Sequence, residues 1–498
     1  MAGNRSLRKE VFSLAAANAV DYALQFIVPV VVARALSPEE FGGYRMVWLV
    51  AATVLAFAPL HTPQSLSYFL PRVERGERPT YIANNAVVLL LLSLLGAATV
   101  NPWHPLLPLH WLNVGQPLWF YPVFVFLWVF GLMTDWLPIS DGRTHWQAAT
   151  ITILSLSRTL LIGATAWYTR DLHAVLMAMV AFSVVKVGAS AFYMLCHYRL
   201  SLRLKWSTMA SQFRYALPFG IGEGVYLMRQ QAEQWVTAAL FNARDFATFS
   251  LGNAAAPLFT LIRQSVHNAV FPRLSELHAR KDHAELAALN RKATSSVAFL
   301  LLPAATALWV YADEVISLIY TPVYKEAAGV MRVYLVGVIP QMVESTVLLR
   351  VGGYGTFGLV LSLVMLPLTI AISYLGILQF GLPGGAIGSV VCAFLSHAAV
   401  IYWASKKLRI SPFSLYDFRA MTLYLTLSAL AAFIGDQLVV QLGFTAFARF
   451  LLGSFAMAVI FLCLAVATRT IPASIATVMT GFVRKILHSK AFLLKKRG

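Results

Sequence analysis

Apolar runs of membrane-spanning length recur from one end of this 498-residue chain to the other. A helix needs roughly 20 mostly apolar residues to cross about 30 Å of hydrocarbon. The sequence divides into about fourteen such runs, joined by short connections, so it predicts an all-α polytopic membrane protein without a separate soluble domain. The runs lie near residues 11–35, 44–70, 81–100, 117–139, 146–168, 173–197, 213–241, 246–271, 293–312, 327–349, 353–379, 383–405, 418–442 and 447–468.

The net charge of +18 is concentrated in alternate connections between these runs. With the N-terminus inside, the outer connections hold few basic residues, among them Arg170, Arg244, Lys325 and Arg449. Such a bias predicts that both termini lie in the cytoplasm and that the number of crossings is even. The charge therefore reflects membrane topology, and we expect no nucleic-acid partner. The inner connections contain Arg5, Arg8, Lys9, Arg72, Arg75, Arg78, Arg199, Arg203, Lys205, Arg280, Lys281, Arg291, Lys292, Lys406, Lys407 and Arg409.

Residues typical of catalytic and metal sites are scattered. Cys196, Cys392 and Cys463 are isolated within or beside apolar runs, without the spacing of a zinc site. The chain shows no nucleophile and base grouping and no glycine loop that would bind nucleotide phosphates. We therefore expect no enzymatic activity, no cofactor and no metal. Energy for transport would come from an ion gradient or from the gradient of the substrate.

An internal repeat relates two halves of the chain. VVARALSPEEFGGYRM (31–46) aligns with VTAALFNARDFATFSL (236–251), which places Phe41 on Phe246 at an offset of 205 residues. Both halves begin inside, so the repeat is parallel, about an axis along the membrane normal. We predict six-helix lobes over 1–198 and 199–412, a helix pair over 413–470, and a basic amphipathic tail over 471–498, either interfacial or solvated. The same offset places four polar or proline positions of the first half on polar ones: Asn18 on Glu223, Asp21 on Tyr226, Gln25 on Gln230, and Pro29 on Gln234.

Three motifs resemble one family. LSPEEFGGYRM after the first run, RYALPFGI at the entry to the seventh and FPRLSEL at the exit from the eighth are similar to the polysaccharide transport (O-antigen or oligosaccharide flippase) family. This family belongs to the multidrug/oligosaccharidyl-lipid/polysaccharide exporter superfamily. The resemblance implies two lobes in a V and translocation of a polyprenyl-diphosphate-linked saccharide across the bacterial inner membrane. The second-half turn, Asp245-Phe246-Ala247, lacks the family glycine.

A polar stripe follows one face of the run 213–241. At 100° per residue, Glu223, Tyr226, Gln230 and Gln234 stack on one side, with Arg229 and Glu233 on its flank. Charges at membrane depth cost a few kcal/mol each, so the stripe is expected to line a hydrated cavity together with Asn18, Asp21 and Gln25. The alternative is a structural pair of Arg229 with Glu233 at i and i+4.

Helix-breaking residues occur in both the first and the seventh run, beside their polar residues. Pro29 can kink the first run, and Pro218 precedes Gly220, Gly222 and Gly224 in the seventh. These residues would let the helices bend during gating. The glycines are equally typical of close helix packing, so both roles stay open.

Further cations lie within the predicted runs, at Arg158, Lys186, Arg263 and Arg332. Guanidinium groups bind phosphate oxygens through paired hydrogen bonds, which suits the diphosphate that the resemblance implies. The alternative is that each cation snorkels to a head group, an explanation that is strongest for Arg332. The carboxylates of the runs either couple transport to H⁺ or Na⁺ or balance these cations: Asp21, Asp135, Glu223, Glu233 and Glu344.

These observations predict a flippase that works by alternating access, with a cationic cavity for the diphosphate and the prenyl chain left in lipid. A polysaccharide polymerase or export machinery is the expected protein partner. One competitor is an ion-coupled multidrug exporter of the same superfamily, although cationic drugs would favour an acidic cavity. The other is a membrane enzyme of polysaccharide assembly, for which the outer connections are too short.

Overall fold

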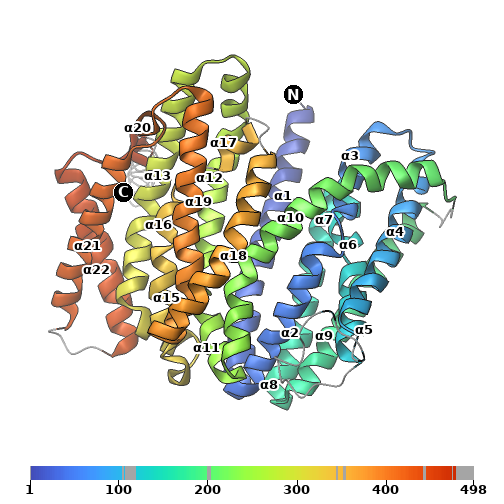
Figure 1. Cartoon of the computed structure of the whole chain (residues 1–498), viewed down its shortest axis with the longest axis horizontal. Coiled ribbons are helices and arrows are strands. Elements are labelled where there is room, and N and C mark those ends of the chain that lie inside the picture. Colours follow the sequence, from blue (N-terminus) through green and yellow to red (C-terminus); the bar gives the residue numbers. More distant parts are fainter. Residues whose placement is uncertain are drawn as a thin grey trace, which may run out of the picture. The chain divides into compact units, whose positions relative to one another are not determined.

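The computed structural model is built of helices (Figure 1). It describes residues 2–101, 103, 106, 119–198, 203–343, 346–351, 355–440, 445–473 and 475–477. Within these ranges no strand occurs, so the predicted all-α class is confirmed. The predicted tail lies almost wholly outside the described residues, as does Glu344.

Ten helices of the described residues are long and apolar enough to cross a membrane. An eleventh crossing results if the bent pair over 38–57 and 62–72 forms one span. The predicted runs fall on helices, but the count of fourteen crossings is not confirmed. Three predicted runs are not among these helices. The helices of the seventh and eighth runs, Trp206–Leu240 and Ala256–Ala279, carry polar residues, and the helix of the tenth run, Ala327–Gln341, is shorter.

The chain divides into two compact units. The first comprises Met1–Ser250 and Ser362–Ile377, and the second comprises Leu251–Leu361 and Leu378–Gly498. The predicted lobe boundary at 198 and 199 stays a prediction. The first unit contains α1 (Ala2–Ala35), α2 (Pro38–Phe57), α3 (Thr62–Phe69), η1 (Leu70–Arg72), α4 (Arg78–Thr99), α5 (Phe120–Phe130), α6 (Met133–Ser140), α7 (Thr144–Arg158), η3 (Thr159–Ala164), α8 (Thr165–Thr169), α9 (Leu172–Tyr198), α10 (Trp206–Leu240) and most of α11 (Ala243–Gly252).

The second unit ends in a helix pair. The hairpin of α21 and α22, drawn in red in Figure 1, packs through α21 against α13. Arg449 of α22 joins it to its neighbours, since its guanidinium lies 3.0 Å from an oxygen of Asp436 and 3.3 Å from one of Glu314. The unit is formed by α12 (Ala256–Ala279), α13 (His283–Val310), α14 (Ala312–Ile319), η4 (Pro322–Tyr324), α15 (Ala327–Val336), α16 (Val338–Gln341), α17 (Thr346–Val351), the ends of α18 (Gly355–Phe380), η5 (Leu382–Ala386), α19 (Ile387–Leu408), α20 (Pro412–Leu415), α21 (Phe418–Val440) and α22 (Ala446–Ala467).

A capping box begins α2 inside the LSPEEFGGYRM motif. The Ser37 hydroxyl accepts a hydrogen bond from the Glu40 backbone N–H at 3.3 Å, and the Glu40 carboxylate accepts one from the Ser37 N–H at 3.0 Å. Pro38 occupies the first turn, where its missing N–H is not needed. The motif therefore fixes where α2 starts.

The second predicted run is broken between α2 and α3, which are bent by 44°. Leu60 and His61 at the break have positive φ values of 44° and 59°, a conformation that costs energy for residues with a Cβ. Two glycines of α10 pack on this break. A Cβ on Gly220 would lie 2.5 Å from Leu60 backbone atoms, and one on Gly224 would lie 2.5 Å from the Phe57 ring. Both glycines therefore serve close packing, whereas a Cβ on Gly222 would meet nothing within 4 Å.

Candidate functional site

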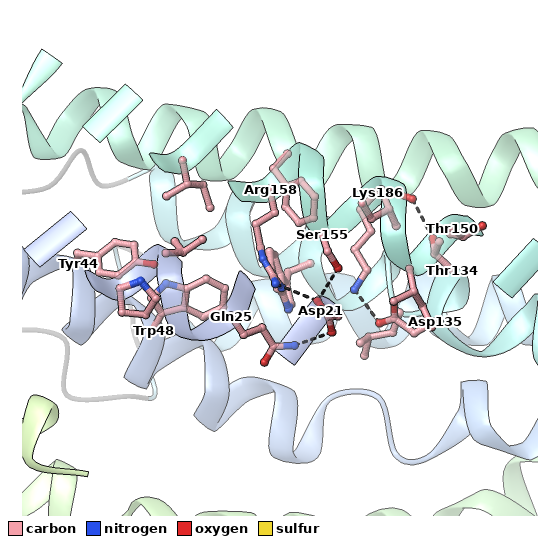
Figure 2. A pocket seen from close by; sticks show the side chains of 18 of the residues that line it. Asp21, Gln25, Tyr44, Trp48, Thr134, Asp135, Thr150, Ser155, Arg158 and Lys186 are labelled. Atoms are coloured by element: carbon pink, nitrogen blue, oxygen red, sulfur yellow. Dashed lines mark hydrogen bonds and ion pairs between the residues drawn. The ribbon is translucent and has the colours of Figure 1, made fainter. Parts of the chain in front are cut away.

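A cavity of about 430 Å³ lies inside the first unit (Figure 2). Its volume falls in the lower part of the range typical of small-molecule sites, roughly 300–1,000 Å³. Side chains from α1, α2, α5, α6, α7, η3 and α9 line it. Six of the predicted residues are among them: Asp21, Gln25, Pro29, Asp135, Arg158 and Lys186.

Helical spacing brings the polar side chains of α1 and α7 to this cavity. Asp21, Gln25 and Pro29 are four residues apart along α1 and therefore share one face. Ser155 and Arg158 lie on the face that α7 turns toward α1. The two helices pack along each other, which joins residues far apart in sequence.

Asp21 is the centre of the first charged cluster. One of its carboxylate oxygens accepts hydrogen bonds from the Arg158 guanidinium at 3.0 Å and from the Ser155 hydroxyl at 2.5 Å. The other oxygen accepts one from the Gln25 amide at 2.7 Å (Figure 2). The Arg158 and Asp21 side chains are 17% and 24% exposed, so the pair is largely, but not completely, withdrawn from solvent. The Arg158 guanidinium donates to Asp21 through one of its nitrogens, so Asp21 competes with a bound anion for this cation.

Lys186 and Asp135 form the second cluster. The Lys186 ammonium donates to Asp135 at 2.7 Å and lies 5.1 Å from the centre of the Trp128 ring. Lys186 is 6% exposed, which places its aliphatic stem in the protein interior. Gly131 makes room for this stem, because a Cβ there would lie 3.2 Å from the Lys186 Cδ.

Aromatic rings form one wall of the cavity. Trp48 meets Trp128 edge to face, with ring centres 4.9 Å apart, and Phe182 lies 5.8 Å from Trp128. Tyr44 continues the wall at 6.4 Å from Trp48. Such rings offer large apolar faces beside the charged clusters.

Gln147 contributes an unused hydrogen-bond acceptor. Its amide N–H donates to the Asp135 backbone carbonyl at 3.0 Å, whereas its buried Oε1 has no hydrogen-bond partner within the described residues. A buried acceptor left unsatisfied costs about 1–3 kcal/mol. Gln147 lines the cavity, but this oxygen is buried behind the wall.

The helix that carries Arg158 changes its winding directly after that residue. The segment η3 is a π-helix, which connects α7 to α8. Single π-turns inside α-helices are frequent at functional sites. Ile162 of this turn also lines the cavity, so the change in winding shapes its wall.

The charged side chains that line the cavity are three cations, Arg45, Arg158 and Lys186, and two carboxylates, Asp21 and Asp135. The arrangement is suited to an anion that takes the place of a carboxylate beside one of the cations. Within the described ranges, no group of three or more His, Cys, Asp or Glu side chains could hold a metal ion.

The stripe of α10 does not line this cavity. Glu223, Tyr226 and Gln230 are exposed on α10, Gln234 is half-buried and Glu233 is buried. Glu223 lies 2.8 Å from the His61 ring, and the Gln230 amide donates to the Tyr226 hydroxyl at 3.3 Å. Arg229 lies over the Tyr226 ring at 5.5 Å, so it is not placed beside Arg158 and Lys186.

Two other predicted residues also lie outside the cavity wall. Asn18 is half-buried on α1 and does not line it. Arg263 is half-buried on α12 in the second unit. Their predicted role in substrate binding stays a prediction.

Sequence reasoning missed several lining residues. Arg45 stands at the beginning of an apolar run, where a cation is typical of a membrane interface. Trp48, Trp128 and Ser155 stand among apolar and small residues, and their sequence context does not indicate that they line a cavity. Asp135 was predicted as a coupling or charge-balancing carboxylate, but only the structure shows that its partner is Lys186.

Two family models match the chain, each over more than half of its length. A model described as polysaccharide biosynthesis protein matches residues 7–278. A model described as lipid II flippase MurJ matches residues 145–461. A search of curated proteins finds no match.

Solved structures of similar fold are distant in sequence. The lipid II flippase MurJ in an inward closed conformation has a TM-score of 0.70 and 12% identity, covering 92% of this chain and 98% of that one. An inward-facing multidrug resistance MATE family transporter of the MOP superfamily has a TM-score of 0.62 and 13% identity, covering 77% and 94%. A MOP superfamily transporter from Pyrococcus furiosus has a TM-score of 0.55 and 13% identity, covering 80% and 96%. At these identities the likeness concerns the fold alone.

Proposed function

Because the chain belongs to the families of polysaccharide biosynthesis proteins and MurJ-type lipid II flippases, we propose that it flips a polyprenyl-diphosphate-linked oligosaccharide. The substrate would cross the bacterial inner membrane, by alternating access, for a cell-surface polysaccharide such as O-antigen. Both termini would lie in the cytoplasm, and a polysaccharide polymerase or export machinery would receive the product.

The cation-lined cavity supports this proposal. Arg158 offers a planar donor pair that matches phosphate oxygens, and Lys186 adds a second positive charge. The aromatic wall of Trp48 and Trp128 suits the apolar face of a sugar ring. A volume of about 430 Å³ accommodates the diphosphate and adjoining sugar rather than a long saccharide.

The same cavity weighs against the multidrug exporter. A cationic drug would need a surplus of carboxylates, whereas Asp21 and Asp135 are outnumbered by the three cations. Both carboxylates are also engaged in ion pairs, with Arg158 and Lys186. The anionic substrate is therefore favoured on electrostatic grounds.

Reconstitution tests this function directly. Purified protein in liposomes is expected to move a fluorescent polyprenyl-diphosphate oligosaccharide between leaflets, scored by the fraction that a membrane-impermeant quencher reaches over time. Empty liposomes set the background rate. Accumulation of a cationic dye without movement of the saccharide would instead support a multidrug exporter.

We further propose that H⁺ or Na⁺ couples to transport through Asp21. A cation on this carboxylate would weaken its hold on Arg158 and free the guanidinium for the diphosphate. Among the predicted coupling residues, Asp21 and Asp135 line the cavity, and Asp21 is the one that pairs with the Arg158 guanidinium. Glu233 is buried elsewhere, and Glu344 lies outside the described residues.

The variant Asp21→Asn is expected to transport at a rate that no longer responds to an imposed proton or sodium gradient. Its amide stays neutral and cannot exchange a cation. The measurement is the liposome rate with and without each gradient, beside the wild-type protein. An undiminished response in Asp21→Asn would assign coupling to another group.

A further inference from the structure

Four rings form a continuous stack on the exposed face of α3 and α10, outside the cavity. Tyr68 stacks on Tyr215 with ring centres 4.3 Å apart. Tyr215 lies 5.3 Å from Phe219, which lies 5.7 Å from His61. We call these four residues the aromatic stack. The spacing of Tyr215 and Phe219 at i and i+4 places both on one face of α10.

Charged groups close both ends of the aromatic stack. The Arg72 guanidinium lies 3.8 Å from the centre of the Tyr68 ring. At the other end, His61 lies 2.8 Å from a carboxylate oxygen of Glu223, which follows Phe219 by one helical turn. The stack therefore offers donors at one end, an acceptor at the other and tyrosine hydroxyls between them.

The rings are accessible although they are large and apolar. Phe219 is 54% exposed and Tyr68 is 38% exposed. A surface in contact with lipid would accept the rings but not the neighbouring Glu223, whose side chain is 46% exposed. The exposed amide of Gln230 continues the same polar face of α10. This face is therefore hydrated and suited to an amphipathic ligand.

We propose that the aromatic stack is a saccharide-binding surface that holds sugars far from the diphosphate. A sugar ring has apolar C–H faces that pack on aromatic rings, and hydroxyl groups that need donors and acceptors at the edge. A prenyl chain would use the rings but leave the charged ends unsatisfied. The inference rests on the proposed function, because it concerns another part of the same substrate.

The position of the stack predicts which substrates it affects. Trp48 of the cavity and His61 of the stack belong to the same broken span, and about 14 Å of helix, at 1.5 Å per residue, separates Trp48 from Phe57, the last helical residue before the break. A single sugar attached to a diphosphate in the cavity would not reach the stack. A saccharide of several sugars would reach the stack. With the proposed topology, the stack lies on the inner half of the span, where a newly made saccharide arrives.

Phe219→Ala is the test variant, because Phe219 is the most exposed ring of the stack and contributes least to packing. Phe219→Tyr keeps the ring. Phe192→Ala is the matched control, since this phenylalanine of α9 is 57% exposed in the same unit. The liposome assay uses two fluorescent probes, a polyprenyl-diphosphate pentasaccharide and a polyprenyl-diphosphate carrying one N-acetylglucosamine.

Phe219→Ala is expected to slow transport of the pentasaccharide probe about three- to tenfold, the loss of one aromatic contact, and to leave the single-sugar probe unchanged. Phe219→Tyr and Phe192→Ala are expected to transport both probes normally. Equal losses for both probes, no loss for either, or a lowered melting temperature of Phe219→Ala would overturn the inference.

Failure of the proposed function can be distinguished from failure of this inference. If the wild-type protein moves neither probe, the flippase proposal fails. Binding of the free pentasaccharide to the purified protein then tests whether the aromatic stack is a saccharide-binding surface. Weaker binding by Phe219→Ala than by Phe192→Ala would support a saccharide site. Equal binding would overturn it.

Discussion

Arg158→Gln is expected to reduce transport of the lipid-linked saccharide about 10- to 100-fold. A hydrogen bond to a charged group contributes about 1.5–3 kcal/mol, and each 1.36 kcal/mol lost from a transition state is tenfold in rate. The glutamine keeps a donor but loses the positive charge and the paired geometry that phosphate requires. The measurement is the initial rate in liposomes at equal amounts of folded protein.

The single variant also leaves Asp21 without its cation. Breaking a fully buried pair costs about 3–5 kcal/mol, and this partly exposed pair should cost less, about 1–3 kcal/mol. Asp21→Asn combined with Arg158→Gln replaces the ion pair by neutral hydrogen-bonding groups, so it should restore the yield of folded protein without restoring transport. Normal transport by this double variant would show that Arg158 does not hold the substrate.

Arg332→Gln supplies the matched control. Arg332 also lies in a predicted run and pairs with a carboxylate, that of Asp313, but it belongs to the second unit and does not line the cavity. We expect its transport rate to stay within about twofold of the wild-type rate, since a partly exposed pair contributes about 1 kcal/mol or less. An equal loss in both variants would point to a general effect of removing membrane-embedded charge.

Gly220→Ala is expected to lower the melting temperature and the yield of the folded protein. The added Cβ would lie 2.5 Å from backbone atoms of Leu60, and backbone cannot turn aside as a flexible side chain can. Overpacking of this kind costs about 1–3 kcal/mol, and α10 would have to move away from the break in the second span. Thermal unfolding in detergent, followed by tryptophan fluorescence, measures the loss.

Gly222→Ala is the control on the same helix. Its Cβ would meet nothing within 4 Å, and alanine is favoured over glycine in a helix by about 1 kcal/mol. This variant should therefore be as stable as the wild-type protein or slightly more stable. Equal melting temperatures for the two variants would contradict the packing role of Gly220.

The all-α fold class and the protein family could be predicted from the sequence. Apolar runs of spanning length predict helices because the bilayer permits few other structures. The resemblance to the polysaccharide transport family is confirmed, and it rested on turn motifs such as the one around Ser37, whose capping box fixes the start of α2. The predicted count of fourteen crossings is not confirmed, because α10 and α12 carry polar residues and do not belong to the helices that are apolar enough to cross a membrane.

The repeat predicted polar faces on α1 and α10 but not what each face meets. Asp21 and Tyr226 are equivalent in the repeat, yet α1 packs along α7, which supplies Ser155 and Arg158. α10 instead packs on α2 and α3 through its glycines and leaves Glu223, Tyr226 and Gln230 of its polar stripe exposed. Which helices become neighbours depends on contacts between distant segments, and a single sequence does not reveal these.

The π-turn after Arg158 also affects how positions are compared between this chain and its relatives. A π-turn closes its hydrogen bonds over one more residue than an α-turn. A related chain with plain α-helix at this place would therefore be one residue shorter between 159 and 164. Its alignment to this chain needs a single gap there. Without that gap, every residue of α8 and α9, including Lys186, would be matched to the wrong neighbour.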